Sequence, residues 1–134
     1  MVGILIVSHG AFGEALIHCA THVLGRRPVR VGQIGVTLHD DPEMILPRAQ
    51  ELVRELDDGH GVLVLTDVLG ATPSNLATRL LQAGRVEGVS GVSLPMLIRA
   101  LTYRDEPLGT VVEKAVSGGL EGVLHIDGHA TGRN

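Results

Sequence analysis

A histidine and an aspartate each follow an aliphatic run that predicts a buried strand. His9 comes just after Val2–Val7, and Asp67 comes just after Gly61–Thr66. A carboxylate that accepts the Nδ1 proton of an imidazole fixes the ring tautomer and leaves Nε2 free as a nucleophile. The same carboxylate stabilises the cation that forms when Nε2 is phosphorylated. This pair of residue types therefore predicts nucleophilic chemistry at His9.

The residues after each of these strands open a predicted helix. Thr72 is the expected N-cap of the second helix, because Pro73 follows it and proline suits the first helical position. Helix N-termini offer unpaired amides and a positive dipole end, which bind phosphate without a lysine. Lys114 is the only lysine in the chain. The predicted phosphate-binding residues are Gly10, Ala11, Gly70, Ala71 and Thr72.

Short aliphatic runs alternate with helical periodicities along the whole chain. This alternation is typical of an α/β domain with three layers, in which helices cover both faces of a mainly parallel open sheet. With a strand order of 2-1-3-4, the loops after strands one and three meet at the switch point where such sheets bind ligands. Strands are expected at 2–7, 30–36, 61–66, 86–93 and 122–126, and helices at 10–24, 41–56, from 72, 95–103 and 108–116.

Several common chemistries lack their motifs in this sequence. There is no G-x-x-x-x-G-K-[ST] phosphate loop, no G-x-G-x-x-G after the first strand and no G-x-S-x-G nucleophile elbow. Asp67 lies near the position of a receiver domain's phospho-acceptor. A receiver also needs an acidic pair after the first strand to hold magnesium, and Ser8 and His9 stand there instead. No cofactor is expected.

Composition excludes further classes of protein. The 134 residues include 11 Lys and Arg against 15 Asp and Glu, a net charge of −4, and the aromatic side chains are those of Phe12 and Tyr103. A nucleic-acid binder needs a basic patch and often stacking aromatics, so no nucleic-acid partner is expected. No apolar run approaches the ~18 residues of a membrane span. We expect one cytoplasmic domain at 1–127, followed by a disordered tail at 128–134.

A metal site on the first helix is the competing chemical interpretation. His18 and His22 have the i, i+4 spacing that can bind zinc, and Glu14 and Cys19 lie close to them in sequence. However, the glutamate of an H-E-x-x-H motif is absent, and the stripe of Phe12, Leu16, Cys19 and Val23 predicts that Cys19 faces the core. We therefore interpret the histidines as a solvated polar face and expect no metal.

Three segments give the sequence a family resemblance. GILIVSHGAFGEAL, VLVLTDVLGATPSN and GVSLPMLIRAL, in this order and spacing, resemble the IIA component of the mannose family of the bacterial phosphoenolpyruvate:sugar phosphotransferase system. The resemblance implies that His9 takes a phosphoryl group from the histidine-containing phosphocarrier protein and passes it to a IIB component. It also implies that Asp67 orients His9. Thr72 stands where many members of the family have serine.

The resemblance also carries expectations about assembly. It implies a fifth, antiparallel edge strand that two subunits exchange, here Gly122–Ile126, and therefore a homodimer. Because the sequence ends soon after that strand, the IIB component is expected on a separate chain. A regulatory IIA-like module, whose phosphorylation state signals to partners outside a transporter, is the alternative that the sequence leaves open.

Overall fold

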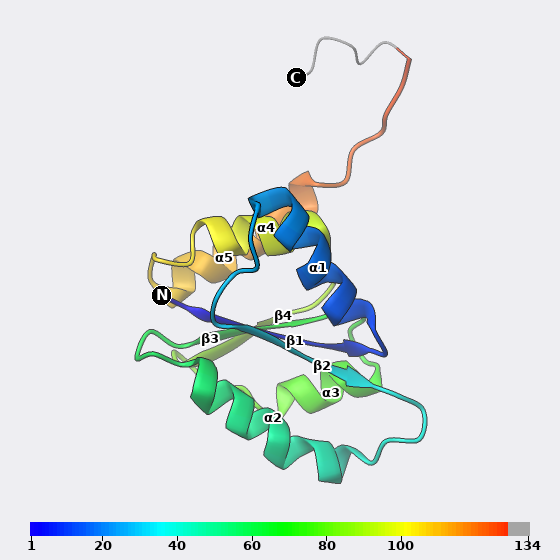
Figure 1. The fold of residues 1–134 in the computed structure, drawn as a ribbon, viewed down its shortest axis with the longest axis vertical. Helices are drawn as coiled ribbons and strands as arrows, with labels where there is room; N and C mark the ends of the chain where they lie inside the picture. Colours follow the sequence, from blue (N-terminus) through cyan, green and yellow to red (C-terminus); the bar gives the residue numbers. More distant parts are fainter. Residues whose placement is uncertain (129–134) are drawn as a thin grey trace.

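The computed structural model describes residues 1–128 as a four-stranded sheet between two layers of helices (Figure 1). The order of elements along the chain confirms the predicted α/β alternation. The elements are β1 (Gly3–His9), α1 (Phe12–Leu24), β2 (Val31–Val36), α2 (Pro42–Leu56), β3 (Val62–Thr66), α3 (Thr72–Thr78), β4 (Val86–Val89), α4 (Leu94–Thr102) and α5 (Leu108–Glu121).

The sheet is parallel and has the strand order β2-β1-β3-β4, as predicted. Its register aligns the carboxyl ends of the three strands that matter for the site. His9 is the last residue of β1 and pairs with Val36 of β2, while Val7 pairs with Thr66 of β3. The loops that follow β1, β2 and β3 therefore leave the sheet side by side.

Each face of the sheet buries its own aliphatic core. Ile4 and Ile6 point toward α1, α4 and α5, whereas Leu5 and Val7 point toward α2 and α3, because side chains alternate along a strand. Figure 1 shows these two helical layers on opposite sides of the strands. The central strands are buried on both faces, which is why β1 and β3 appear as nearly continuous aliphatic runs in the sequence.

The buried face of α1 differs from the predicted stripe. Its buried residues are Gly13, Leu16, Ile17 and Ala20. Gly13 packs so closely on β1 that a Cβ there would lie 3.1 Å from the Ser8 hydroxyl, so the helix rotates its small residues toward the sheet. Phe12, Cys19 and Val23 are exposed, and the expectation that Cys19 faces the core is wrong.

The C-terminal elements also depart from prediction. β4 ends at Val89 instead of residue 93, and α5 continues to Glu121 instead of ending at residue 116. Gly122 caps α5, and the predicted strand at 122–126 pairs with no strand between residues 1 and 128. An edge strand forms only where another strand's backbone accepts it, so its exchange with a second copy stays a prediction. Most of the predicted tail, 129–134, lies outside the described residues.

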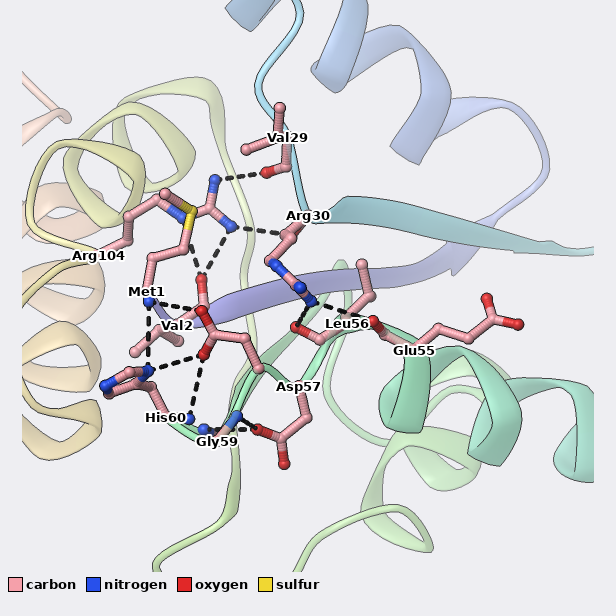
Figure 2. Close-up of polar contacts among 12 residues, drawn as sticks. Met1, Val2, Val29, Arg30, Glu55, Leu56, Asp57, Gly59, His60 and Arg104 are labelled. Carbon is pink, nitrogen blue, oxygen red and sulfur yellow. Dashed lines mark hydrogen bonds and ion pairs between the residues drawn. The ribbon is translucent and has the colours of Figure 1, made fainter.

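At the amino ends of the strands, Arg104 bonds three backbone carbonyls, which belong to the segments that lead into β1 and β2 (Figure 2). Its guanidinium donates to the Val2 carbonyl from Nε and Nη2, at 3.0 and 2.8 Å. It also donates to the carbonyls of Val29, at 2.6 Å, and Arg30, at 2.8 Å. Arg104 is 6% exposed, so these bonds satisfy a buried cation and fix the start of the sheet. None of the helices between residues 1 and 128 is long and apolar enough to cross a membrane.

Candidate functional site

His9 ends β1 at the carboxyl edge of the sheet, and two glycines shape the turn that follows it. Gly10 has φ 50°, in the left-handed region that favours glycine, and its N–H donates to the Val36 carbonyl at 3.0 Å. Gly35 of β2 passes against this turn so closely that a Cβ there would overlap the Gly10 carbonyl oxygen. These contacts hold the backbone of His9 against the end of β2.

Asp67 comes directly after β3 and bonds both the backbone and the ring of His9. Its Oδ2 accepts from the His9 N–H at 2.9 Å and lies 2.7 Å from His9 Nδ1, while its Oδ1 accepts from the Val68 N–H at 2.9 Å. The Asp67 side chain is 11% exposed, whereas that of His9 is 55% exposed. The fold therefore brings together the two residues that the sequence singled out, across 58 positions of chain.

The protonation state of the pair follows from these contacts. Burial by itself raises the pKa of Asp67, but the hydrogen bonds from the His9 backbone, the His9 ring and the Val68 N–H outweigh it and hold this pKa below its ordinary value. An ionised carboxylate only accepts hydrogen bonds, so the proton of the 2.7 Å contact belongs to His9 Nδ1. Nε2 of the neutral ring then carries a free lone pair.

A cavity of about 400 Å³ opens beside His9. Of the predicted phosphate-binding residues, Gly10 and Thr72 line it together with His9, whereas Gly70 and Ala71 do not. The lining residues are His9, Gly10, Val36, Thr37, Leu38, Asp40, Pro42 and Thr72.

Three of the amides predicted to bind phosphate already have acceptors. Besides Gly10, the Gly70 N–H donates to the Ser74 Oγ at 3.2 Å, and the Ala71 N–H donates to the Val68 carbonyl at 3.4 Å. Ser74 is buried and ties the loop after β3 to α3, a role that its position inside a predicted helix did not suggest. Ala11 is the N-cap residue of α1 and is exposed.

Thr72 begins α3, and the N-cap is Ala71, so the predicted cap is wrong by one residue. Pro73 is the second residue of α3. Proline fits there because the first four amides of a helix have no partner within the helix, so the missing N–H of proline costs no hydrogen bond at either the first or the second position. Since no side chain caps α3, the Thr72 hydroxyl is not committed to a cap, and Thr72 lines the cavity beside His9.

The loop after β2 is the part of the site that the sequence interpretation missed. Thr37, Leu38 and Asp40 line the cavity, and the Thr37 N–H donates to Asp40 Oδ2 at 2.7 Å. The predicted strand order contained the signal, because strand two neighbours strand one on the side away from strand three. The switch point is flanked only by the loops after strands one and three, so a prediction based on it omits the loop after strand two.

Large apolar side chains lie on the same edge of the molecule and are exposed to solvent. Leu38 is 99% exposed, and the others come from the start of α1, the first turn of α2 and the loop after β3. They are Phe12, Leu38, Met44, Val68 and Leu69. We call these five residues the apolar rim.

The alternative metal site on α1 lacks a third ligand in the structure. The rings of His18 and His22 make an edge contact with centroids 5.0 Å apart, and both side chains are exposed. Between residues 1 and 128, no group of three or more His, Cys, Asp or Glu side chains is arranged to hold a metal ion. Cys19 is exposed on the same helix without completing such a group.

The sequence as a whole matches a known family. Residues 3–116 match the family described as EIIA-man, PTS system fructose IIA component. The chain belongs to this family of phosphotransferase-system IIA components. IIA components of this system are phosphotransfer proteins, and the family match covers both His9 and Asp67.

Individual relatives agree with the family assignment. The chain is 33% identical over 125 residues to the PTS system mannose-specific EIIAB component of Escherichia coli K12. The match covers 91% of this chain and 38% of that relative. It is also 26% identical over 102 residues to the transcriptional regulatory protein LevR of Bacillus subtilis. That match covers 75% of this chain and 10% of LevR. The chain thus spans well under half of either relative.

A solved structure gives the same result for the fold. Phosphotransferase system component EIIA from Streptococcus agalactiae superposes with a TM-score of 0.82 at 28% identity, over 93% of this chain and 97% of that one. The likeness covers nearly the full length of both chains.

Proposed function

We propose that this IIA component accepts a phosphoryl group on His9 Nε2 from the phosphorylated histidine-containing phosphocarrier protein and passes it to a histidine of a IIB component. The observation that carries the proposal is the 2.7 Å contact between Asp67 Oδ2 and His9 Nδ1. It fixes the proton on Nδ1, so the nucleophilic lone pair belongs to the other ring nitrogen, on a side chain that is 55% exposed.

The transfer needs no proton movement at His9. The Nε2 lone pair attacks the donor's phosphorus, the donor's nitrogen–phosphorus bond breaks, and the donor ring keeps the electron pair of that bond. Phosphorylated His9 is then a cationic ring that retains its Nδ1 proton, and Asp67 balances that positive charge at contact distance. In the second transfer the IIB histidine attacks the phosphorus on His9, the bond between His9 Nε2 and phosphorus breaks, and Nε2 regains its lone pair. The Thr72 hydroxyl, on the wall of the same cavity, would donate to the phosphoryl oxygens.

The apolar rim supports docking of protein partners rather than a small substrate. A phosphoryl group moves directly between two histidines only when two protein surfaces meet around them, and exposed apolar side chains around a polar centre are typical of such contacts. Leu38 and Leu69, at 99% and 77% exposure, are the most exposed members of the rim. We place the protein in the cytoplasm, where both partners of a IIA component act.

Phosphorylation is tested by incubating the protein with the phosphocarrier, its kinase and labelled phosphoenolpyruvate. A phosphohistidine label is stable in base and labile in acid. His9→Ala should form no label, while His60→Ala, which removes a second histidine bonded to an aspartate, should label normally. Normal labelling of His9→Ala would disprove the assignment of His9.

We also propose that two copies exchange residues 122–126 as an edge strand. Two features support this proposal. Val123 and Ile126 are 82% and 87% exposed, and beyond the bridge between Val86 and Gln82 the edge of β4 away from β3 pairs with no strand of the described residues. Sedimentation equilibrium should give twice the mass of one chain, and a variant truncated after Glu121 should sediment as a monomer. A monomer at all concentrations of the intact protein would contradict the exchange.

A regulatory role is the second candidate, and the similarity to LevR favours it. In this role the phosphorylation of His9 would alter binding to a partner outside a sugar transporter. Binding assays with phosphorylated and unphosphorylated protein distinguish the roles. A regulatory module should show phosphorylation-dependent binding to such a partner, whereas a transport component should transfer its label to a IIB protein.

A further inference from the structure

The cavity beside His9 is lined by a carboxylate and by no strongly basic side chain. Of the residues between 1 and 128 that line it, Asp40 is the acidic one, and none is lysine or arginine. Phosphate sites in proteins usually contain a basic side chain, a helix N-terminus or both. A phosphoryl group on His9 would therefore meet a negative charge in this cavity, with no lysine or arginine on its walls to balance that charge.

Asp40 is held in the loop between β2 and α2, which leaves the sheet beside the turn that follows β1 (Figure 1). Its Oδ2 accepts from the Thr37 N–H at 2.7 Å, and its own N–H donates to the Thr37 carbonyl at 3.2 Å. Within residues 1–128, no lysine, arginine or histidine forms an ion pair with Asp40. The turn thus fixes the position of the carboxylate without neutralising its charge.

The neighbouring Asp41 differs from Asp40 in its relation to the cavity. Its Oδ1 accepts from the Glu43 N–H at 3.0 Å and caps α2, and it does not line the cavity. Both aspartates are exposed, and each accepts a hydrogen bond from a backbone N–H. The two residues therefore carry the same charge in the same loop, and Asp40 is the one that borders the space beside His9.

We infer that Asp40 weakens the hold of this protein on its phosphoryl group and so favours release of the group to the next acceptor. This inference rests on the proposed function. A phosphoryl group carries a charge of about −1.5 to −2 near neutral pH. The cavity is roughly 9 Å across, about one Debye length at physiological salt. Repulsion over that distance is only partly screened, so it raises the free energy of phosphorylated His9 and leaves that of the unphosphorylated protein unchanged.

The two carboxylates next to His9 act in opposite directions. Asp67 Oδ2 lies 2.7 Å from Nδ1 and balances the cationic ring that forms on phosphorylation. Asp40 acts instead on the phosphoryl group bound to Nε2, through space across the cavity. Asp67 thus makes phosphorylation of His9 possible, and Asp40 sets how far the equilibrium with the phosphocarrier favours the phosphorylated form.

The equilibrium of phosphoryl transfer tests this role directly. The phosphocarrier is phosphorylated with its kinase and phosphoenolpyruvate, freed of both, and mixed with an equal concentration of this protein. A gel that separates phosphorylated from unphosphorylated chains measures the distribution. Asp40→Asn keeps an oxygen that can accept the Thr37 N–H but removes the charge, so we expect the equilibrium constant to shift by about 3- to 10-fold toward phosphorylated His9.

Asp41→Asn is the matched control. It removes one charge from the same loop and retains a good N-cap for α2, so it should keep the equilibrium constant of the parent. An unchanged constant in Asp40→Asn, or an equal shift in Asp41→Asn, would overturn the inference while leaving the role of His9 in place. A parent protein that takes no phosphoryl group from the phosphocarrier would refute the proposed function itself.

Salt separates a charge effect from a structural effect of the substitution. In about 1 M salt the Debye length falls to about 3 Å, so the shift caused by Asp40→Asn should shrink to less than about 2-fold. A change in loop structure would alter the equilibrium at any ionic strength. A shift of the same size at low and high salt would therefore also overturn the inference.

Discussion

Among residues 1–128, two histidine–aspartate pairs with nearly equal nitrogen–oxygen distances lie at opposite ends of the sheet. At the carboxyl end His9 Nδ1 lies 2.7 Å from Asp67 Oδ2, and at the amino end His60 Nδ1 lies 2.8 Å from Asp58 Oδ1. The difference lies in what surrounds each pair. Distance alone therefore does not identify the reactive histidine.

The second pair is local, and its carboxylate is shared. Asp58 and His60 are two residues apart in one turn, and the other oxygen of Asp58 accepts from the Met1 amino group at 2.8 Å. The turn follows the C-terminus of α2, the negative end of a helix, which repels phosphate. By contrast, His9 lies between the starts of α1 and α3, on a cavity with a threonine hydroxyl. The environment of each pair, and not the distance within it, is what distinguishes the proposed phosphate site at His9.

Replacing the aspartate of each pair in turn should give the largest difference, which is in the rate of phosphorylation. In Asp67→Asn the negative charge that balances a cationic His9 ring is lost, and one amide oxygen cannot accept all of the hydrogen bonds that Asp67 accepts from the His9 ring and from the His9 and Val68 N–H groups. We expect phosphorylation by the phosphocarrier to slow by about 10²- to 10⁴-fold, the range seen when an aspartate that orients a catalytic histidine is lost. Asp58→Asn should label at the parent rate. The measurement is the initial rate of label incorporation, and equal rates for the two variants would contradict the distinction.

Arg104→Met should have the next largest effect, on stability and at the amino end. It removes the guanidinium donor of the Val2 and Val29 carbonyls and one of the two donors of the Arg30 carbonyl, which keeps the Ile4 N–H, and we expect a loss of about 3 kcal/mol in the free energy of unfolding. Urea denaturation measures this loss. His9 should still label below the lowered melting temperature, because Arg104 lies at the other end of the sheet. A stability equal to that of the parent would show that water replaces the guanidinium.

Substitutions of two glycines of β2 test whether the carboxyl end of the sheet is more sensitive than the amino end. Gly35→Ala places a methyl group on the Gly10 carbonyl, so we expect about 2 kcal/mol of destabilisation together with slower labelling of His9. Gly32→Ala is the matched control, because its Cβ would meet Leu56 Cδ1 at 3.6 Å, an ordinary contact. Thermal melts and labelling rates check both variants. Slower labelling in Gly32→Ala would show that the site is sensitive to any change in β2.

The smallest expected effect is the contribution of the Asp58 carboxylate to stability at low pH. Its hydrogen bonds with the Met1 amino group and His60 hold the pKa of Asp58 well below its ordinary value. A depressed folded-state pKa stabilises the protein above the unfolded pKa near 4, and this contribution is lost as the pH falls toward the folded value. Melting temperature should therefore fall less steeply between pH 4 and pH 2 in Asp58→Asn than in the parent. Because these groups are exposed, we expect a difference of at most a few degrees.

Local patterns predicted most of the elements but not their contacts. The strand at 61–66 and the helix at 41–56 agree with β3 and α2 to within one residue, because burial on both faces and a proline start leave plain signals. The face of α1 could not be predicted from its periodicity. Phe12 and Cys19 fit a helical stripe as well as Gly13 and Ala20 do, and the close packing of Gly13 on Ser8 decided between the two.

The sequence by itself predicted the strand order that the structure confirms, and it singled out the two residues of the candidate site, because His9 and Asp67 each follow a plainly aliphatic strand. Only the tertiary structure decided which oxygen of Asp67 bonds the ring, that the loop after β2 completes the cavity, and that Gly10, Gly70 and Ala71 already use their amides. The physical reason is the range of the interactions. Strands and helix starts are specified by neighbouring residues, whereas a hydrogen bond across 58 positions exists only once β1 and β3 lie in register.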